Sequence, residues 1–181
     1  MKNIIGILSI LLLLTGCVSG VDFDQIDDIE VYTDHNASLV YFNLDANDFL
    51  DDLGNETLVL SDTFNIPVFA GPYSENYLIQ ADFLFTISNT FTRDISLQYE
   101  FLDENDNSLF LVEPINSLPN SINEEYIRII SEAQIPNVIT TEKFVMQILM
   151  GNGTPLDPSL NLSFNAESAV LLHYKVTTED E

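Results

Sequence analysis

Residues 77–87, Tyr-Leu-Ile-Gln-Ala-Asp-Phe-Leu-Phe-Thr-Ile, contain the pattern that decides the fold. Apolar residues fill every odd position from Tyr77 to Ile87, whereas the polar residues of the stretch stand at even positions. Because successive side chains of a strand point to opposite faces, this alternation predicts a β-strand with one buried face. The same alternation returns in residues 95–101, Ile-Ser-Leu-Gln-Tyr-Glu-Phe. These two segments are the clearest strand predictions in the chain.

Further strands are predicted on both sides of this pair, where short apolar runs lie between breaks rich in Pro, Gly, Asn and Asp. They cover residues 39–44, 109–112, 126–130, 144–150, 160–164 and 169–176. We expect connections at residues 89–94 and between Pro114 and Pro119. A helical turn is expected between Ser131 and Thr140, kept short by Pro136. About eight short strands and at most one short helix predict an all-β, antiparallel β-sandwich of immunoglobulin-like architecture, with an up-and-down barrel as the alternative.

The charge of the chain is extreme for a single domain. Residues 17–181 hold all 29 acidic residues and four of the five basic ones, so their formal charge is 4 − 29 = −25. Disordered acidic chains are poor in aromatic residues, whereas this chain has 12 Phe, 7 Tyr and 46% hydrophobic residues, so we expect acids that coat a folded core. Nucleic-acid binding and attraction to anionic headgroups are disfavoured, because both need clustered cations.

The N-terminus has the pattern of an export signal. Met1-Lys2-Asn3 is a short positive leader, and residues 4–14 form an apolar stretch interrupted only by Gly6 and Ser9. Eleven residues are too few for a membrane-spanning helix, which needs about twenty. The stretch is therefore predicted to be a signal that is removed.

The segment Leu14-Thr15-Gly16-Cys17 resembles the lipobox of bacterial lipoproteins. This resemblance implies cleavage before Cys17 and attachment of fatty acids such as palmitate to its sulfur and its amine. Cys17 is also the only cysteine, so the mature chain has no disulfide. Two or three acyl chains anchor a protein stably, whereas one holds it only marginally. The resemblance thus implies a protein anchored to a membrane by lipid rather than spanning it.

The whole chain is similar to uncharacterised lipoproteins of the Bacteroidota, which have a lipobox, an acidic stretch and a β-rich domain. Val18 after the cysteine favours the outer membrane under the sorting rules of bacterial lipoproteins. The first acid, Asp22, is displaced from the position used for surface export, which leaves the periplasmic and cell-surface faces both open. The predicted organisation is a signal peptide at 1–16, an acidic tether at 17–34 and one β-sandwich domain at 35–181.

Residues that could carry out catalysis are few. His35 and His173 are the only histidines, and neither a Gly-x-Ser-x-Gly motif nor a Gly-rich phosphate loop occurs. We expect His35 to face solvent in the tether and His173 to be an ordinary strand residue. No catalytic residue, metal ligand or cofactor is therefore assigned.

Two acidic clusters are candidate calcium sites. Asp103, Asn105 and Asn107 have the first spacings of an EF-hand, but Ser108 replaces the required Gly and Pro114 stands at the twelfth position. A looser calcium site is possible there or at residues 45–52, although a solvated turn is the preferred interpretation. Tyr or Phe could stack on a glycan, but Trp is absent. We expect most of six tyrosines to lie in the core: Tyr41, Tyr73, Tyr77, Tyr99, Tyr126 and Tyr174.

The function predicted from these observations is a non-enzymatic, lipid-anchored envelope protein with a binding or structural role, whose partner is an envelope protein and not a nucleic acid. A calcium- or glycan-binding module is the first alternative, and an envelope hydrolase is the second. A pocket that joins a carboxylate to His173 would favour the hydrolase. Exposed aromatic residues beside an acidic loop would favour glycan binding, and an exposed strand edge would favour a protein partner.

Overall fold

The structure, a computed structural model, describes residues 30–65, 69 and 71–177. Cys17, the predicted signal peptide and most of the predicted tether lie outside these residues. The chain divides into a small unit, Met1–Val31 with Val176–Glu181, and a large unit, Tyr32–Lys175, which contains nearly all of both sheets. No helix in the described part of the chain is long and apolar enough to cross a membrane.

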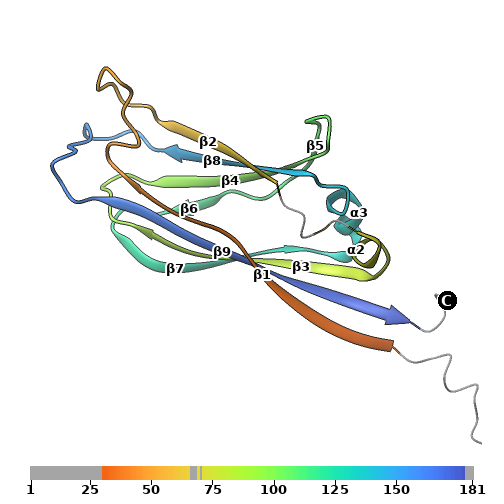
Figure 1. Ribbon diagram of the computed structural model, residues 1–181. Helices are drawn as coiled ribbons and strands as arrows, with labels where there is room; N and C mark the ends of the chain where they lie inside the picture. Colours follow the sequence, from red (N-terminus) through yellow and green to blue (C-terminus); the bar gives the residue numbers. More distant parts are fainter. Residues whose placement is uncertain (1–29, 66–68, 70, 178–181) are drawn as a thin grey trace, which may run out of the picture. The chain divides into compact units, whose positions relative to one another are not determined.

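The strands form two antiparallel sheets, which confirms the predicted all-β sandwich (Figure 1). A four-stranded sheet has the order β1-β9-β3-β7, and a five-stranded sheet has the order β2-β8-β4-β5, with β6 also paired to β4. In chain order the elements are β1 (Glu30–Asp45), β2 (Val59–Asn65), α2 (Pro72–Tyr77), β3 (Leu78–Asn89), β4 (Ile95–Leu102), β5 (Ser108–Leu111), β6 (Ile115–Ser117), β7 (Ser121–Ile130), η3 (Glu132–Gln134), α3 (Ile135–Val138), β8 (Lys143–Met150) and β9 (Ser163–Thr177).

The core lies between the two sheets and is rich in stacked aromatic rings. Tyr99 of β4 lies between Phe85 of β3 and Phe144 of β8, with ring centroids 4.9 and 4.8 Å apart. The buried face of β3 from residue 81 to residue 87 is the predicted one, and Phe83 is 1% exposed. Burying each large apolar side chain contributes about 1.5–3 kcal/mol, so this aromatic layer is a main source of stability.

Several predicted boundaries differ from the structure. Residues 160–176 were predicted as two strands, but β9 is one strand of 15 residues, because residues 165–168 continue the alternation instead of turning. β6 lies inside the predicted loop between Pro114 and Pro119 and pairs with β4. β1 begins at Glu30, within the stretch predicted as tether, and β2 and α2 were not predicted. The helical turn expected between Ser131 and Thr140 is present as η3 and α3.

The large unit has two ends of different construction (Figure 1). We call one the loop end: it consists of the connections 46–58, 90–94, 118–120 and 151–162. We call the other the helix end: it consists of α2, η3, α3, the turn at 103–107, the beginning of β1 and the last part of β9. Because strands run between these two ends, each end gathers residues that are distant in sequence.

Candidate functional site

His173 lies between two carboxylates on the outer face of the four-stranded sheet. Its Nδ1 is 2.8 Å from Oδ1 of Asp34 on β1, and its Nε2 is 3.0 Å from Oδ2 of Asp82 on β3. Gln80 donates a hydrogen bond of 2.7 Å from Nε2 to the other oxygen of Asp82. The side chain of His173 is 25% exposed. The imidazole therefore links β1, β9 and β3, a role that the sequence alone did not reveal.

This arrangement is suited to an ion pair rather than to catalysis. Burial lowers the pKa of His173, but the hydrogen bonds and charges of Asp82 and Asp34 outweigh it and hold that pKa above its ordinary value. A protonated imidazole donates from both nitrogens, one to each carboxylate. A general base needs a free nitrogen near a nucleophile, and both nitrogens are occupied here. The contact between a carboxylate and His173 thus does not create the site that a hydrolase would need.

His35 lies in a ring cluster on the other face of the same strands. Its ring centroid is 5.2 Å from that of Tyr174 and 6.3 Å from that of Tyr73. Tyr73 in turn lies 4.8 Å from Tyr174 and 5.2 Å from Tyr77. His35 is exposed, as predicted, but it belongs to β1 and not to a tether.

The two acidic clusters are turns that bind their own backbone. Asp103 accepts hydrogen bonds of 2.8 Å from the backbone N–H groups of Asn105 and Asn107 and from the side-chain amide of Asn107. Asp51 accepts equivalent bonds from Leu53 and Asn55. Hydrogen bonds from the neighbouring Asn side chain, above all, hold the pKa of each of these two carboxyl groups below its usual range. In the described residues, no group of three or more His, Cys, Asp or Glu is arranged to hold a metal ion.

Arg93 organises the loop end, and sequence reasoning missed it. Its side chain is 2% exposed and forms a bidentate ion pair with Glu56, with N–O distances of 2.9 and 3.0 Å. Its Nε and Nη2 donate to the carbonyl of Thr154, and Oε1 of Glu56 accepts a bond of 2.6 Å from the N–H of Leu156. The hydrogen bond to Arg93 holds the pKa of Glu56 below its usual range. Three of the four connections of the loop end are thereby fixed to one another.

An apolar strip crosses the outer face of the four-stranded sheet. Leu84 of β3 pairs with Ile127 of β7 on one side and with Ala169 of β9 on the other. In the next row, Asp82 pairs with Ile129 and Leu171. We use the name apolar strip for Tyr41, Leu84, Ile127, Ile129, Ala169 and Leu171. The exposed fractions are 39% for Leu84, 56% for Ile127, 58% for Ile129 and 70% for Tyr41, so large aliphatic and aromatic surfaces face solvent.

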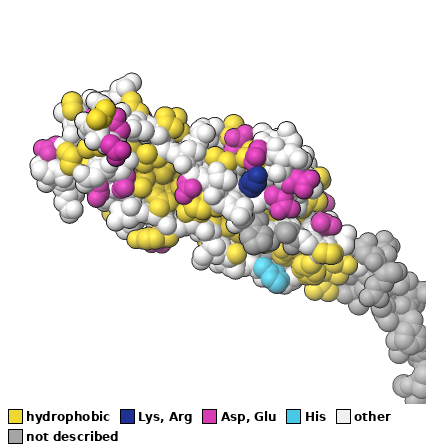
Figure 2. Space-filling model, turned by 45° about the horizontal axis from the view of Figure 1, so that its top comes forward, with side chains coloured by type: hydrophobic (Ala, Val, Ile, Leu, Met, Phe, Trp, Pro, Cys, Tyr) yellow, Lys and Arg dark blue, Asp and Glu magenta, His cyan; other side chains and the backbone are white. Residues whose placement is uncertain are grey.

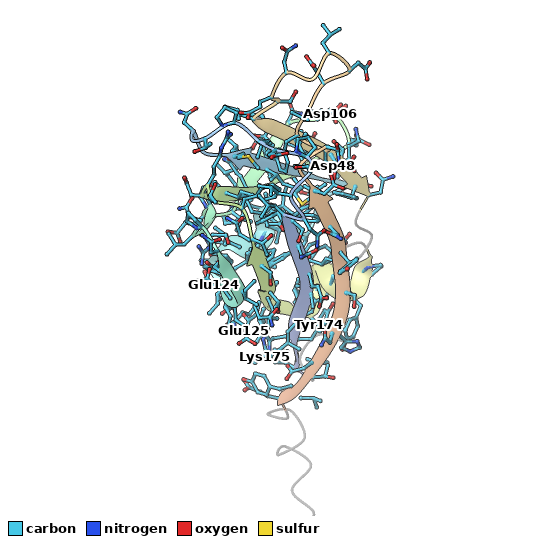
Figure 3. All side chains as sticks on the ribbon, turned by 90° about the vertical axis from the view of Figure 1, so that its left-hand side faces the viewer. Asp48, Asp106, Glu124, Glu125, Tyr174 and Lys175 are labelled. Carbon is cyan, nitrogen blue, oxygen red and sulfur yellow. The ribbon has the colours of Figure 1, made fainter. Side chains whose placement is uncertain are left out.

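A groove of about 530 Å³ continues the strip toward β1. It is lined by residues 38–41 of β1, by Leu84 and Thr86 of β3, and by residues 167–169 of β9. In contrast, the central row of the outer face of the five-stranded sheet is polar, with Gln147 between Ser61 and Gln98. Charged residues occur close to the strip, for example Glu125 on β7, which Figure 3 labels. The outer face of the four-stranded sheet therefore carries an apolar strip, whereas the outer face of the five-stranded sheet has a polar central row.

The positions of the tyrosines correct the prediction that most of them are core residues. Of the six tyrosines, only Tyr99 and Tyr174 are buried. Tyr41 and Tyr73 are exposed, because Tyr41 belongs to the outer face of an edge strand and Tyr73 to the short helix α2. Apolar neighbours in the sequence do not distinguish the two faces of an edge strand.

No protein-family model and no curated protein matches the sequence. Among solved structures, a candidate secreted protein from Parabacteroides distasonis ATCC 8503 has a TM-score of 0.47 at 13% identity, over 63% of this chain and 37% of the other. The infectious bursal disease virus VP2 subviral particle has a TM-score of 0.42 at 6% identity, over 82% of this chain and 34% of the other. The chain thus spans little more than a third of the length of these proteins. Both TM-scores lie below 0.5, so this likeness carries no information on function.

Proposed function

We propose that this protein is a non-enzymatic lipoprotein of the bacterial outer membrane that binds a partner protein through the apolar strip. The location is supported by the N-terminal sequence: the charged leader, the eleven-residue apolar stretch and the lipobox-like Leu-Thr-Gly-Cys that ends at Cys17. Acylation at Cys17 would provide the attachment, because the acidic chain has no cluster of cations to hold anionic lipid.

The observation that carries the binding proposal is the exposure of Ile127, Ile129, Leu84 and Tyr41 in a chain of net charge −24. Exposed isoleucines lower the solubility of a protein, so their presence on a surface otherwise rich in acids indicates another role for them. Exposed apolar residues that adjoin one another and have a polar rim are typical of protein interaction surfaces. The strip is also continuous with a groove that lies over β9, flanked by β1 and β3, so a partner side chain can lie in it.

The partner's chemistry follows from the rim of the strip. Glu125 and Glu167 flank Thr86 in the row beyond Leu84 and give this border of the strip negative charge. A matching surface therefore has apolar side chains at its centre and Lys or Arg at its border, where opposite charges speed association. A hydrolase is less well supported, because both nitrogens of His173 already bind carboxylates.

The anchor is tested by the variant Cys17→Ser. The wild-type protein is expected to incorporate a fatty-acid probe and to lose its signal peptide, whereas the variant does neither. Equal labelling of the two proteins would contradict the proposed anchor.

The binding face is tested separately with a photo-crosslinking amino acid placed at Ile127 in intact cells. The matched control is the same amino acid at Val59, which is 50% exposed on the outer face of the five-stranded sheet. We expect a discrete crosslinked protein from position 127 that disappears when Leu84→Asp is added, and none from position 59. Identical products from both positions, or products insensitive to Leu84→Asp, would contradict a specific site on the strip.

A further inference from the structure

Aromatic residues gather at the helix end of the large unit. Tyr32 is 61% exposed and Tyr73 is 44% exposed, while His35 is exposed and Tyr77 half-buried. They come from the beginning of β1 and from α2, which are separated by more than thirty residues in sequence. Figure 2 shows a group of hydrophobic side chains beside a histidine at this end. We call Tyr32, His35, Tyr73 and Tyr77 the aromatic cluster.

The cluster is held in place by the core. Tyr174 of β9 is 4% exposed, and its ring contacts both Tyr73 and His35. Its hydroxyl lies 3.2 Å from the hydroxyl of Ser74, the residue after Tyr73 in α2. Tyr32 lies beside Lys175, whose Nζ is 6.0 Å from the ring centroid. Figure 3 labels Tyr174 and Lys175 near the end of β9. The positions of the exposed rings are thus set by contacts within the protein.

The chain length before β1 limits how far this end can be from a lipid at Cys17. Only twelve residues, 18–29, separate Cys17 from Glu30, where β1 begins. A fully extended chain advances about 3.3–3.6 Å per residue, so the span is at most about 45 Å. Tyr32 and His35 follow Glu30 almost at once. Of the two ends of the large unit, the helix end is the one at which the chain from the anchor enters.

We infer that the aromatic cluster rests in the headgroup region of the membrane that holds the anchor, so that the helix end faces the lipid and the loop end faces away. This inference depends on the proposed lipid anchor. Tyr rings are enriched at membrane interfaces because one edge is apolar and the hydroxyl remains hydrated. Glu75 lies in the same helix as Tyr73 and the chain carries a net charge of −24, so the preferred lipids are zwitterionic rather than anionic.

The absence of Trp from the chain allows a direct test with single-Trp variants. The probe is Tyr73→Trp, and the matched control is Leu53→Trp, at a residue that is 86% exposed in the loop end. Each variant is purified as the full lipidated protein and inserted into phosphatidylcholine vesicles, with and without brominated acyl chains. We expect a blue-shifted emission and at least twofold quenching by brominated lipid at position 73, and neither at position 53. Replacing a fifth of the lipid with phosphatidylglycerol should reduce the quenching.

The outcomes separate this inference from the anchor. If the protein floats with the vesicles in a density gradient but Trp at position 73 is no more quenched than Trp at position 53, the inference is overturned and the anchor stands. If the lipidated chain does not float, both are overturned. If the Trp at position 73 responds to soluble dextran and not to brominated lipid, the cluster is a glycan platform and the inference is wrong.

Discussion

The loop end and the helix end each contain a cationic side chain that links segments distant in sequence, Arg93 and His173 respectively, but the two cations differ in kind. Arg93 is almost fully buried and keeps its charge at every pH at which proteins fold. His173 is a quarter exposed, and although Asp82 and Asp34 raise its pKa, it loses its proton and its charge as the pH rises through that pKa. The loop end is therefore fixed permanently, whereas the attachment of β1 at the helix end depends on a proton. In a chain with so few cations, the contacts of Arg93 and of His173 each join segments that are distant in sequence.

The largest effect is expected from Arg93→Ala. Removing the guanidinium leaves Glu56 unpaired and the carbonyl of Thr154 without its donor, and the loss of one partner of a buried ion pair costs about 3–5 kcal/mol. Because Glu56 is 28% exposed, we expect the lower part of this range. Urea denaturation measures the change. Arg128→Ala is the control and should cost less than about 1 kcal/mol, since within the described residues Arg128 pairs with the exposed Glu113 at 3.8 Å and its hydrogen bonds go to exposed backbone carbonyls. Equal losses of stability in both variants would mean that the buried contacts of Arg93 do not hold the loop end together.

A second test asks whether the loop end is rigid around Arg93. A Cβ added at Gly153 would lie 2.9 Å from Cγ of Arg93, whose position is fixed by its hydrogen bonds. We expect Gly153→Ala to lower the free energy of unfolding by about 1–3 kcal/mol, the usual cost of overpacking. Gly151→Ala is a demanding control, because the three atoms nearest to its Cβ all belong to the carboxylate of Asp94, an exposed residue whose side chain can turn toward solvent. If Gly151→Ala proves the more harmful of the two, Arg93 is not the rigid element.

The helix end is tested by the pH dependence of stability. The pKa of His173 is raised in the folded state, so its contribution is complete below about pH 6.5, the ordinary value, and is lost as the pH rises through the folded pKa. We expect the wild-type protein to lose about 1 kcal/mol over this interval, the upper range for a partly exposed ion pair. His173→Gln should remove this loss, and His35→Gln should retain it. Thermal unfolding at several pH values gives the comparison, and a pH dependence that survives in His173→Gln would exclude the proposed link.

The smallest effect is expected from calcium, because both ends of the large unit contain an acidic turn of the same kind. The acidic turn at 103–107 belongs to the helix end and that at 51–55 to the loop end, and each carboxylate is engaged with its own backbone. Millimolar calcium and a sodium salt of matched ionic strength should therefore raise the melting temperature equally, because screening depends on ionic strength alone. Saturable stabilisation by calcium that is lost in Asp103→Asn would revive a calcium-binding module.

The sequence predicted the strands whose faces are cleanly divided between core and solvent. In β3, β4 and β8, alternation at Phe83, Tyr99 and Phe144 matches the buried face, because both neighbouring strands keep these residues in register. In β9, residues 165–168 read as a turn, since nothing local distinguishes polar strand residues from polar turn residues. β2 was missed because an edge strand buries few side chains, and only Leu60 and Phe64 mark its inner face.

The contacts of His173 and Arg93 could not be predicted for a different reason. Asp82 was recognised as a residue on the polar face of its strand, and His173 as a strand residue. Their meeting depends on the pairing of β3 with β9, which places Gln80 opposite His173 across a separation of about ninety residues. Arg93 reads as part of a polar connection, and only the folded loop end brings Glu56 and Thr154 to it. Pairings of this kind are set by topology and not by local pattern.

Every described Lys and Arg contacts a group of its own chain, and this affects the electrostatic interaction between copies of the protein. Arg93 contacts Glu56, Lys143 contacts Asp106 at 2.7 Å, and the remaining two lie against groups of their own chain: Arg128 against Glu113 and Pro114, and Lys175 against Tyr32. A neighbouring molecule thus faces a surface on which negative charge predominates. On a membrane that carries many copies, electrostatic repulsion would act over about 8 Å at physiological ionic strength. The lateral spacing of the molecules would then widen in dilute salt and narrow in concentrated salt.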